Sequence, residues 1–228
     1  ILAINFILSD VGLDEVLQTF LMGLATFTRV VILLIVSTLI WVPIGVAIGF
    51  NPRLSQFVQP FVTFLASFPA NFLFPFVTLF FIQHNIDINF GGIVLMSLGA
   101  QWYILFNTIA GAMSIPSDLR EMTRNFGVKG WQRWRELIIP GIFGAWVTGG
   151  ITATGGAWNA SIVAELVSWG DKTLEAYGLG AYIARVTAVG DWHRIVLGVG
   201  MMCFFVVGLN RLFWRRLYEI AERRFKLG

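Results

Sequence analysis

Polar side chains inside long apolar stretches are the residues of this sequence best suited to chemistry. Most are amides and hydroxyls, and one is a carboxylate: Asn71, Gln101, Asn107, Asn159, Ser161 and Glu165. A polar group in such surroundings is costly unless it meets a partner or water, so each either bonds a neighbouring helix or lines a path for a polar solute. Helix-to-helix bonding, worth about 0.6 kcal/mol on average in one membrane protein, is the simpler interpretation for any single residue. Together they outline a cavity.

Residues 117–140 form a second, charged group between two apolar stretches. Its first part predicts a short amphipathic helix, because three apolar residues recur at helical spacing: Leu119, Met122 and Phe126. Ser117 or Asp118 can cap this helix. Glu121 follows Asp118 at the spacing of a capping box, so it serves either local capping or contact with a partner.

The second part of this segment starts after two glycines, Gly127 and Gly130. Another amphipathic run follows, with one apolar face made of Trp131, Trp134 and Leu137. We expect Pro140 to end this helix and to start the next apolar segment. Two short helices would then lie across a membrane surface, either simply resting on lipid with the tryptophans at headgroup depth or presenting a docking surface.

The elements that position these groups belong to a membrane protein. The chain is 57% hydrophobic and only 13% charged, whereas soluble domains have about 25% charged residues. A span needs about 20 mostly apolar residues, and five stretches qualify, at about 24–50, 56–82, 91–113, 141–166 and 195–213. Prolines break the second of these stretches. Membrane spans tolerate prolines when neighbouring helices satisfy the freed backbone groups. We predict an all-α polytopic protein with a single transmembrane domain over residues 1–228.

The basic residues predict the orientation, because Lys and Arg in short loops favour the cytoplasmic side. With five spans, the side of the charged segment collects Arg53, Arg120, Arg124, Lys129, Arg133, Arg135, Arg211, Arg215, Arg216, Arg223, Arg224 and Lys226. The other side keeps Arg29, Lys172, Arg185 and Arg194. We therefore place residues 114–140 and the C-terminus in the cytoplasm. The net charge of +3 suits anionic lipids and a protein partner, and no nucleic acid is expected.

Two further pairs concern packing between spans. Arg29 and Glu165 fall near the outer ends of the first and fourth spans, where they either pair across the bundle or extend separately to the headgroups. Gly45 and Gly49 have the spacing of small residues that permit close helix contact.

Catalysis has no support in the sequence. No G-x-x-x-x-G-K-[ST] loop for binding nucleotide phosphates occurs, and neither His84 nor His193 belongs to a metal-ligand or hydrolase motif. Cys203, the single cysteine, lies within the last apolar stretch. We predict no catalytic residue, no metal site and no cofactor on this chain, and an intramembrane enzyme is disfavoured.

The charged segment resembles the EAA motif found in inner-membrane permeases of ATP-binding-cassette importers. That motif reads Glu-Ala-Ala, three residues, Gly, nine residues, and then Ile-x-Leu-Pro. Glu121, Met122 and Thr123 stand at the opening triplet, Gly127 follows after three residues, and residues 137–140 follow after nine more. Met122 and Thr123 replace two alanines and add bulk where close docking is expected.

The rest of the chain resembles the nitrate, sulfonate and taurine branch of these permeases over about residues 13–217. The similar segments are Thr28–Arg29, Pro43 with Gly45 and Gly49, the eight residues 158–165, and the Gly-Leu-Gly sequence at 178–180. The resemblance implies a type I importer fold that moves a small solute, such as the anions nitrate, sulfonate or bicarbonate, or taurine.

The resemblance also implies partners. Two permease halves, identical or different, would lie side by side, each receiving a cytosolic ATPase subunit that handles ATP and Mg²⁺, while an external solute-binding protein delivers the solute. The coupling residues would be Arg120, Glu121, Met122, Thr123, Arg124, Gly127, Arg133 and Pro140. Arg120, Glu121, Arg124 and Arg133 would face the ATPase, with Trp131 and Trp134 on the membrane side.

Two alternatives stay open at this point. Residues 1–13 are too short to span, so we expect an upstream helix, one half of a fused permease, or a five-helix subunit. A secondary transporter or a channel is the competing function, in which the basic segment would only set the topology.

Overall fold

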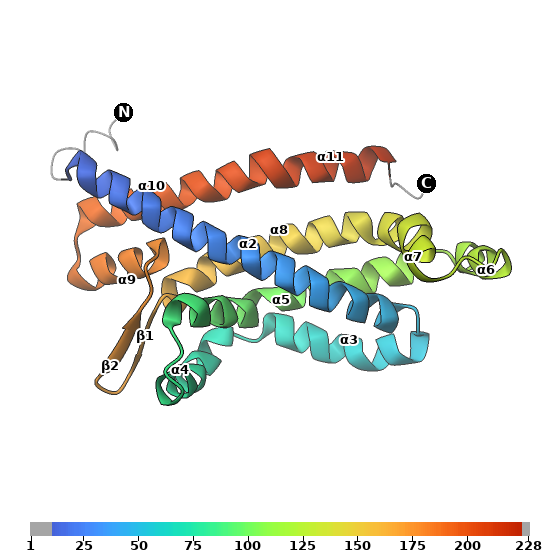
Figure 1. The fold of residues 1–228 in the computed structure, drawn as a ribbon, viewed down its shortest axis with the longest axis horizontal. Helices are drawn as coiled ribbons and strands as arrows, with labels where there is room; N and C mark the ends of the chain where they lie inside the picture. The colour runs from blue at the N-terminus through green and yellow to red at the C-terminus, as the bar shows by residue number, and fades with distance from the viewer. Residues whose placement is uncertain (1–10, 225–228) are drawn as a thin grey trace. The chain divides into compact units, whose positions relative to one another are not determined.

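The computed structural model describes residues 11–224, which are mostly helical (Figure 1). Contacts group the chain into two compact units. Unit 1 contains the residues up to Leu33 together with Pro69–Gly99 and Thr154–Leu209. Unit 2 contains Leu34–Phe68, Ala100–Ala153 and the residues from Asn210 onwards.

Four helical runs in the described residues are long and apolar enough to cross a membrane. They are α2 (Leu13–Gly49), α5 (Ile88–Ser114), the run Gly130–Ala164 and the run Trp192–Arg223. The third joins α7 (Gly130–Arg133), the π-helical turn η2 (Trp134–Ile138) and α8 (Ile139–Ala164). The fourth joins α10 (Trp192–Leu209), the π-helical turn η3 (Asn210–Trp214) and α11 (Arg215–Arg224). The first run begins at Leu13, well before the predicted residue 24.

The remaining predicted span is broken. It consists of α3 (Pro52–Ser67), followed by η1 (Ala70–Leu73) and α4 (Phe74–Gln83), with a bend of 82° between the two halves. Pro69 explains the break, because the residue before a proline avoids helical backbone angles, and Phe68 is extended with ψ 130°. Counted as one span, the bent pair gives the predicted five.

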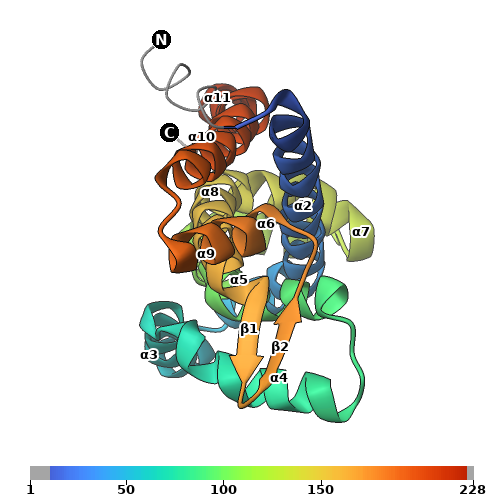
Figure 2. The same ribbon diagram turned by 90° about the vertical axis from the view of Figure 1, so that its left-hand side faces the viewer.

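The predicted helical membrane fold is confirmed, and one short β-hairpin, which was not predicted, accompanies the helices. Strands β1 (Leu166–Trp169) and β2 (Lys172–Glu175) pair antiparallel, and β1 lies against α4 (Figure 2). Gly170 starts the two-residue turn with a φ of +57°, which favours glycine. A Gly-Asp pair between two short strands is a hairpin signal, but the second strand, Lys-Thr-Leu-Glu, has little strand-forming character of its own. The helix α9 (Leu179–Val189) follows.

Close contact between α2 and α5 in unit 2 depends on two glycines. A Cβ placed on Gly45 would lie 2.9 Å from the side chain of Thr108, and one on Gly49 would lie 2.6 Å from Cβ of Ala112. The predicted role of this pair in helix contact is confirmed. Elsewhere, Gly144 of α8 has no such neighbour within 4 Å among the described residues.

These glycines permit a matched stability test. Gly49→Ala should destabilise the protein by about 1–3 kcal/mol, because the added methyl group overpacks the helix contact. Gly144→Ala, the control, should be neutral or stabilising, since alanine favours a helix by about 1 kcal/mol over glycine. Unfolding of the purified protein in detergent, followed by tryptophan fluorescence, measures both. Equal effects at the two positions would contradict the packing described here.

Candidate functional site

Helix α6 (Ser117–Asn125) carries the first half of the charged segment. Leu119 is partly buried and packs with Trp134 against a cluster in unit 2 that includes Leu137. Met122 and Phe126 are 52% and 78% exposed. The predicted apolar stripe is therefore divided, with Leu119 fixing the helix to the protein and the other two residues facing outward.

The predicted capping of α6 is wrong. The helix begins one residue earlier than a Ser117 cap requires, so Pro116 occupies the N-cap position and no side chain bonds the free backbone amides there. The Ser117 hydroxyl donates instead to Oδ1 of Asp118 at 3.3 Å. Asp118 still lies in the first turn, where a carboxylate favours the positive end of the helix. Glu121 is exposed and is not needed for capping.

Gly127 ends α6 for a conformational reason. Its φ is +69°, in the left-handed region, and its N–H donates to the Arg124 carbonyl at 3.1 Å. The next N–H, of Val128, donates to the Thr123 carbonyl at 2.9 Å. This pair of bonds is a Schellman motif, in which glycine is favoured because it has no Cβ. Gly127, the glycine of the EAA-like sequence, is thus required to turn the chain after α6.

Pro140 lies inside a continuous helical run, so the prediction that it ends the second helix is wrong. The helix widens into the π-helical turn η2 just before it, where the Ile139 N–H donates to the Trp134 carbonyl five residues back. A π-turn accommodates the proline because proline lacks the N–H that an α-helix would use. The loop helix α7 therefore continues into α8.

Phe50 holds the loop to the end of α2. The guanidinium groups of Arg120 and Arg133 lie over its ring at 5.5 and 5.2 Å from the centroid. Each such cation–π contact contributes about 0.5–2 kcal/mol. Two of the four charged residues predicted to face a partner are thus engaged within unit 2, whereas Glu121 and Arg124 are exposed.

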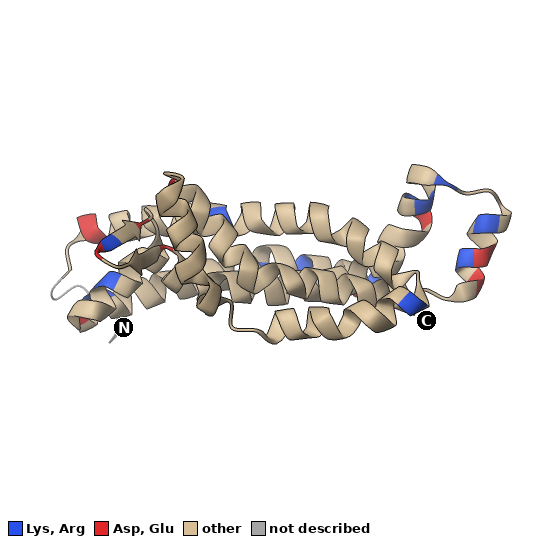
Figure 3. Cartoon of the chain, turned by 90° about the horizontal axis from the view of Figure 1, so that it is seen from below, with Lys and Arg blue, Asp and Glu red and all other residues tan. Residues whose placement is uncertain are grey.

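A positively charged hollow of about 480 Å³ lies between α6 and α7, and Figure 3 shows basic and acidic residues on these helices. Its lining contains four basic residues and one acidic residue, in the set Ser117, Arg120, Glu121, Arg124, Val128, Lys129 and Arg133. The excess of cations suits carboxylate groups of a partner protein. Thr123 does not contribute its hydroxyl, which donates to the carbonyls of Leu119 and Arg120.

A second polar group, in unit 1, surrounds the buried carboxylate of Glu165 directly after α8. Arg29 of α2 donates to its Oε1 from Nη1 at 2.7 Å. The hydroxyl of Thr26 donates to Oε1 at 2.8 Å, and the Gly180 N–H donates to Oε2 at 2.8 Å. Of the two alternatives for Arg29 and Glu165, pairing is therefore confirmed.

Arg29 extends this network to the start of α5. Its Nε donates to the backbone carbonyl of Asn89 at 3.0 Å, and its Nη2 donates to the Asn89 Oδ1 at 2.7 Å. The Tyr177 N–H donates to the same Oδ1 at 3.1 Å. Sequence reasoning missed Thr26 and Asn89, because an isolated Thr or Asn gives no signal without its partner.

The hydrogen-bond network around Glu165 requires glycine at positions 178 and 180. A Cβ on Gly178 would collide with the Glu165 carboxylate, and one on Gly180 would collide with the Ser161 carbonyl. Leu179 lies between them and donates its N–H to the Thr26 hydroxyl at 2.8 Å. The two glycines thus allow the backbone to approach a buried charge closely.

The predicted path residues have different surroundings. Ser161 is buried and donates to the Trp158 carbonyl at 2.7 Å. Gln101 accepts from Trp41 Nε1 at 2.9 Å, and Asn107 donates to the Tyr103 carbonyl at 2.8 Å. Asn71 and Asn159 are exposed. Gln101 and Asn107 belong to unit 2 and the other four to unit 1, so a shared role in a path stays a prediction.

A further ion cluster in unit 1 was not predicted. Arg194 donates to both carboxylate oxygens of Glu15, at 2.8 and 3.0 Å, and to Asp191 at 2.6 Å. Hydrogen bonding from Arg194 lowers the pKa of Asp191. Burial and the hydrogen bond to Glu15 raise the pKa of Tyr182 to about 12, and its hydroxyl donates to Oε1 of Glu15 at 3.0 Å.

The buried pair permits a stability test with an exposed pair as control. Arg29→Met should destabilise the protein by about 3–5 kcal/mol, because it leaves a buried carboxylate unpaired. Adding Glu165→Gln to it should recover part of this loss. Arg185→Met, at an ion pair whose side chains are 52% and 42% exposed, should cost at most about 1 kcal/mol.

Unfolding in detergent compares the three variants with the unchanged protein. An Arg29→Met protein no less stable than the Arg185→Met protein would show that the network does not depend on this charge pair. A double variant less stable than Arg29→Met would contradict the compensation between the two residues.

Comparison with known proteins identifies relatives over most of the chain. Residues 41–227 match the family of binding-protein-dependent transport system inner membrane components. The bicarbonate transport permease CmpB of Synechococcus elongatus is 27% identical over 90% of this chain and 73% of its own length. A putative aliphatic sulfonates permease, SsuC of Bacillus subtilis, is 26% identical over 77% of this chain and 63% of its own length.

A third relative transports a different kind of solute. The glycine betaine/proline betaine permease ProW of Escherichia coli is 26% identical over 83% of this chain and 51% of its own length. The chain thus spans between about half and about three quarters of these three relatives. The family match favours the importer over a secondary transporter or a channel. The chain belongs to the binding-protein-dependent inner membrane component family, and it is a multi-pass, non-catalytic permease subunit of an ATP-binding-cassette importer.

Proposed function

We propose that this permease forms half of a path for a small anion and that the loop between α5 and α8 couples it to a cytosolic ATPase. ATP and Mg²⁺ bind that ATPase, and an external solute-binding protein delivers the solute. A second permease half, identical or different, completes the path. The proposed coupling is supported by one observation: the loop is packed against the protein on one side and exposes apolar and charged side chains on the other.

The loop is firmly held on one side and open on the other. Leu119 and the two arginines on Phe50 attach it to the protein, while Met122 and Phe126 are exposed. Exposed apolar side chains beside charged ones are typical of a protein interface. A partner that moves α6 would therefore move α7, and with it the continuous helix α8.

The distribution of basic residues supports a cytoplasmic position for the loop. Every basic residue that the sequence placed on the loop side belongs to unit 2 where the structure describes it. The four predicted on the opposite side, among them Arg29 and Lys172, belong to unit 1. The proposal rests on the count, because twelve basic residues fall on the loop side and four on the other, as expected when the loop side is cytoplasmic.

The proposed anion rests on two of the relatives. Their names assign bicarbonate and aliphatic sulfonates to them, while another is a betaine permease. Uptake of labelled bicarbonate, a sulfonate and glycine betaine by vesicles containing the complete transporter distinguishes these classes. Uptake of the betaine alone would replace the anion proposal and leave the coupling proposal intact.

Coupling can be tested at the loop. Glu121→Lys together with Gly127→Leu should reduce solute-stimulated ATP hydrolysis at least tenfold, because it reverses an exposed charge and forces a bulky residue into a left-handed turn. Membrane insertion should be unaffected. Lys172→Glu, on the exposed hairpin, provides a charge-reversal control outside the loop.

The measurement is ATPase activity of the complex in vesicles, together with recovery of the ATPase subunit on the purified permease. Normal stimulation in the loop variant would refute coupling through this segment. Equal loss in the Lys172→Glu protein would show that the effect is not specific to the loop.

Orientation can be tested with single cysteines in a Cys203→Ser background. Lys129 and Lys172 are both exposed, and they lie on opposite sides in the proposed topology. A membrane-impermeant thiol reagent added to intact cells should label Lys172→Cys and label Lys129→Cys only after lysis. The reverse pattern would invert the topology.

A further inference from the structure

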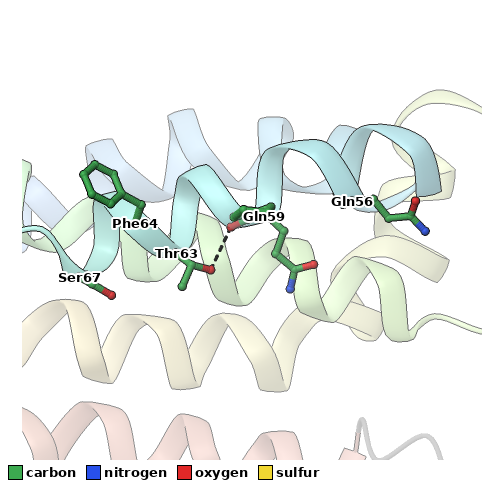
Figure 4. Close-up of a pocket in the computed structure, with 6 residues that line it drawn as sticks. Gln56, Gln59, Thr63, Phe64 and Ser67 are labelled. Atoms are coloured by element: carbon green, nitrogen blue, oxygen red, sulfur yellow. Dashed lines mark hydrogen bonds between the residues drawn. The ribbon is translucent and has the colours of Figure 1, made fainter.

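One side of α3 carries a row of polar side chains. Gln56, Gln59, Thr63 and Ser67 recur every three or four residues along this helix, as residues on one face do. Figure 4 shows Gln59, Thr63 and Ser67 projecting to the same side, while Phe64 projects to another. An open hollow of about 660 Å³ follows these residues.

The other sides of α3 are apolar or buried. Phe57 and Phe61 are 68% and 58% exposed, as expected of side chains that contact lipid. Ser55 and Val62 are buried within unit 2, where Val62 packs with Leu105 of α5. The polar row therefore occupies a separate side between the lipid face and the packed face.

The polar row cannot face hydrocarbon cheaply. Polar side chains within membrane segments nearly always face a protein interior or a water-filled cavity. Among the described residues, the side-chain hydrogen bond on this row is that from the Thr63 hydroxyl to the backbone carbonyl of Gln59, at 2.9 Å. Among the residues that the structure describes, the side-chain amides of Gln56 and Gln59 have no hydrogen-bond partner.

We propose that this face of α3 is a wall of the solute path, completed by the second permease half. A dry helix contact is the poorer explanation, because such contacts use small residues that let backbones approach, whereas glutamine side chains are long and need hydrogen-bond partners. Amides and hydroxyls supply neutral donors and acceptors. They suit a small hydrated solute that exchanges water for hydrogen bonds, including an oxyanion accepting from the amide N–H groups.

This inference rests on the proposed function, so the test uses the permease assembled with its ATPase and second half in vesicles. Cysteines replace Gln59, Thr63 or Ser67 in the Cys203→Ser background, with Phe57→Cys and Phe61→Cys as controls on the same helix. A membrane-impermeant methanethiosulfonate should modify the polar positions at least tenfold faster than the controls. Bicarbonate, a sulfonate and glycine betaine are added in separate reactions at saturating concentration, and the one that the vesicles take up should slow modification of the polar positions and not of the controls.

Three outcomes would overturn the proposal. Equal slow modification on both faces would place the polar row away from water. Efficient disulfide cross-linking between two copies, without modification by the reagent, would make the row a dry interface. Modification that solute does not slow would make it a water-filled surface outside the path. Recovery of the ATPase with the complex is measured first, so failure of the proposed function is recognised separately.

Discussion

The ion pair between Arg29 and Glu165 is the constraint around which the rest of unit 1 is organised. Both side chains are buried, at 8% and 0% exposure, and each would be prohibitively costly there alone. The remaining hydrogen-bonding groups of the pair therefore fix other elements: Arg29 bonds Asn89 of α5, and Glu165 bonds the start of α9 through Gly180. Glycines at 178 and 180 follow from this arrangement, because any side chain there would collide with it.

In unit 2, an aromatic ring stabilises charged side chains that would otherwise pack poorly. The loop between α5 and α8 is rich in charged residues, and a highly charged loop does not pack well by itself. Phe50 provides an apolar surface that also attracts cations, so Arg120 and Arg133 fix the loop while remaining partly exposed. The π-turn before Pro140 then joins α7 to α8 without a break.

The sequence predicted the spans and the loop well because both depend on local patterns of apolar and charged residues. It also predicted the glycine contacts of α2, since small residues at that spacing have few other uses. The cap of α6, the π-turn at Pro140 and the β-hairpin were missed, because a shift of one residue or a short turn hardly changes periodicity. Thr26, Asn89 and Phe50 were missed because their roles depend on partners far away in the chain. The polar residues of α3 recur at helical spacing in the sequence, but the prolines of the same segment drew attention to its break and not to this face.

Several charged residues of this permease pair with one another, among them Arg29 with Glu165 and Arg194 with Glu15. In unit 2, the basic residues that the structure describes lie on the loop, at the start of α3 and along the last helical run. The polar side of α3 is uncharged from Gln56 to Ser67. A path with such a wall offers a solute hydrogen bonds that water can replace, but no charge that would bind the solute strongly. The solute can therefore dissociate from this wall easily. In the proposed mechanism, the energy for transport acts on the shape of the path, and the cytosolic ATPase applies it at the loop that Phe50 holds.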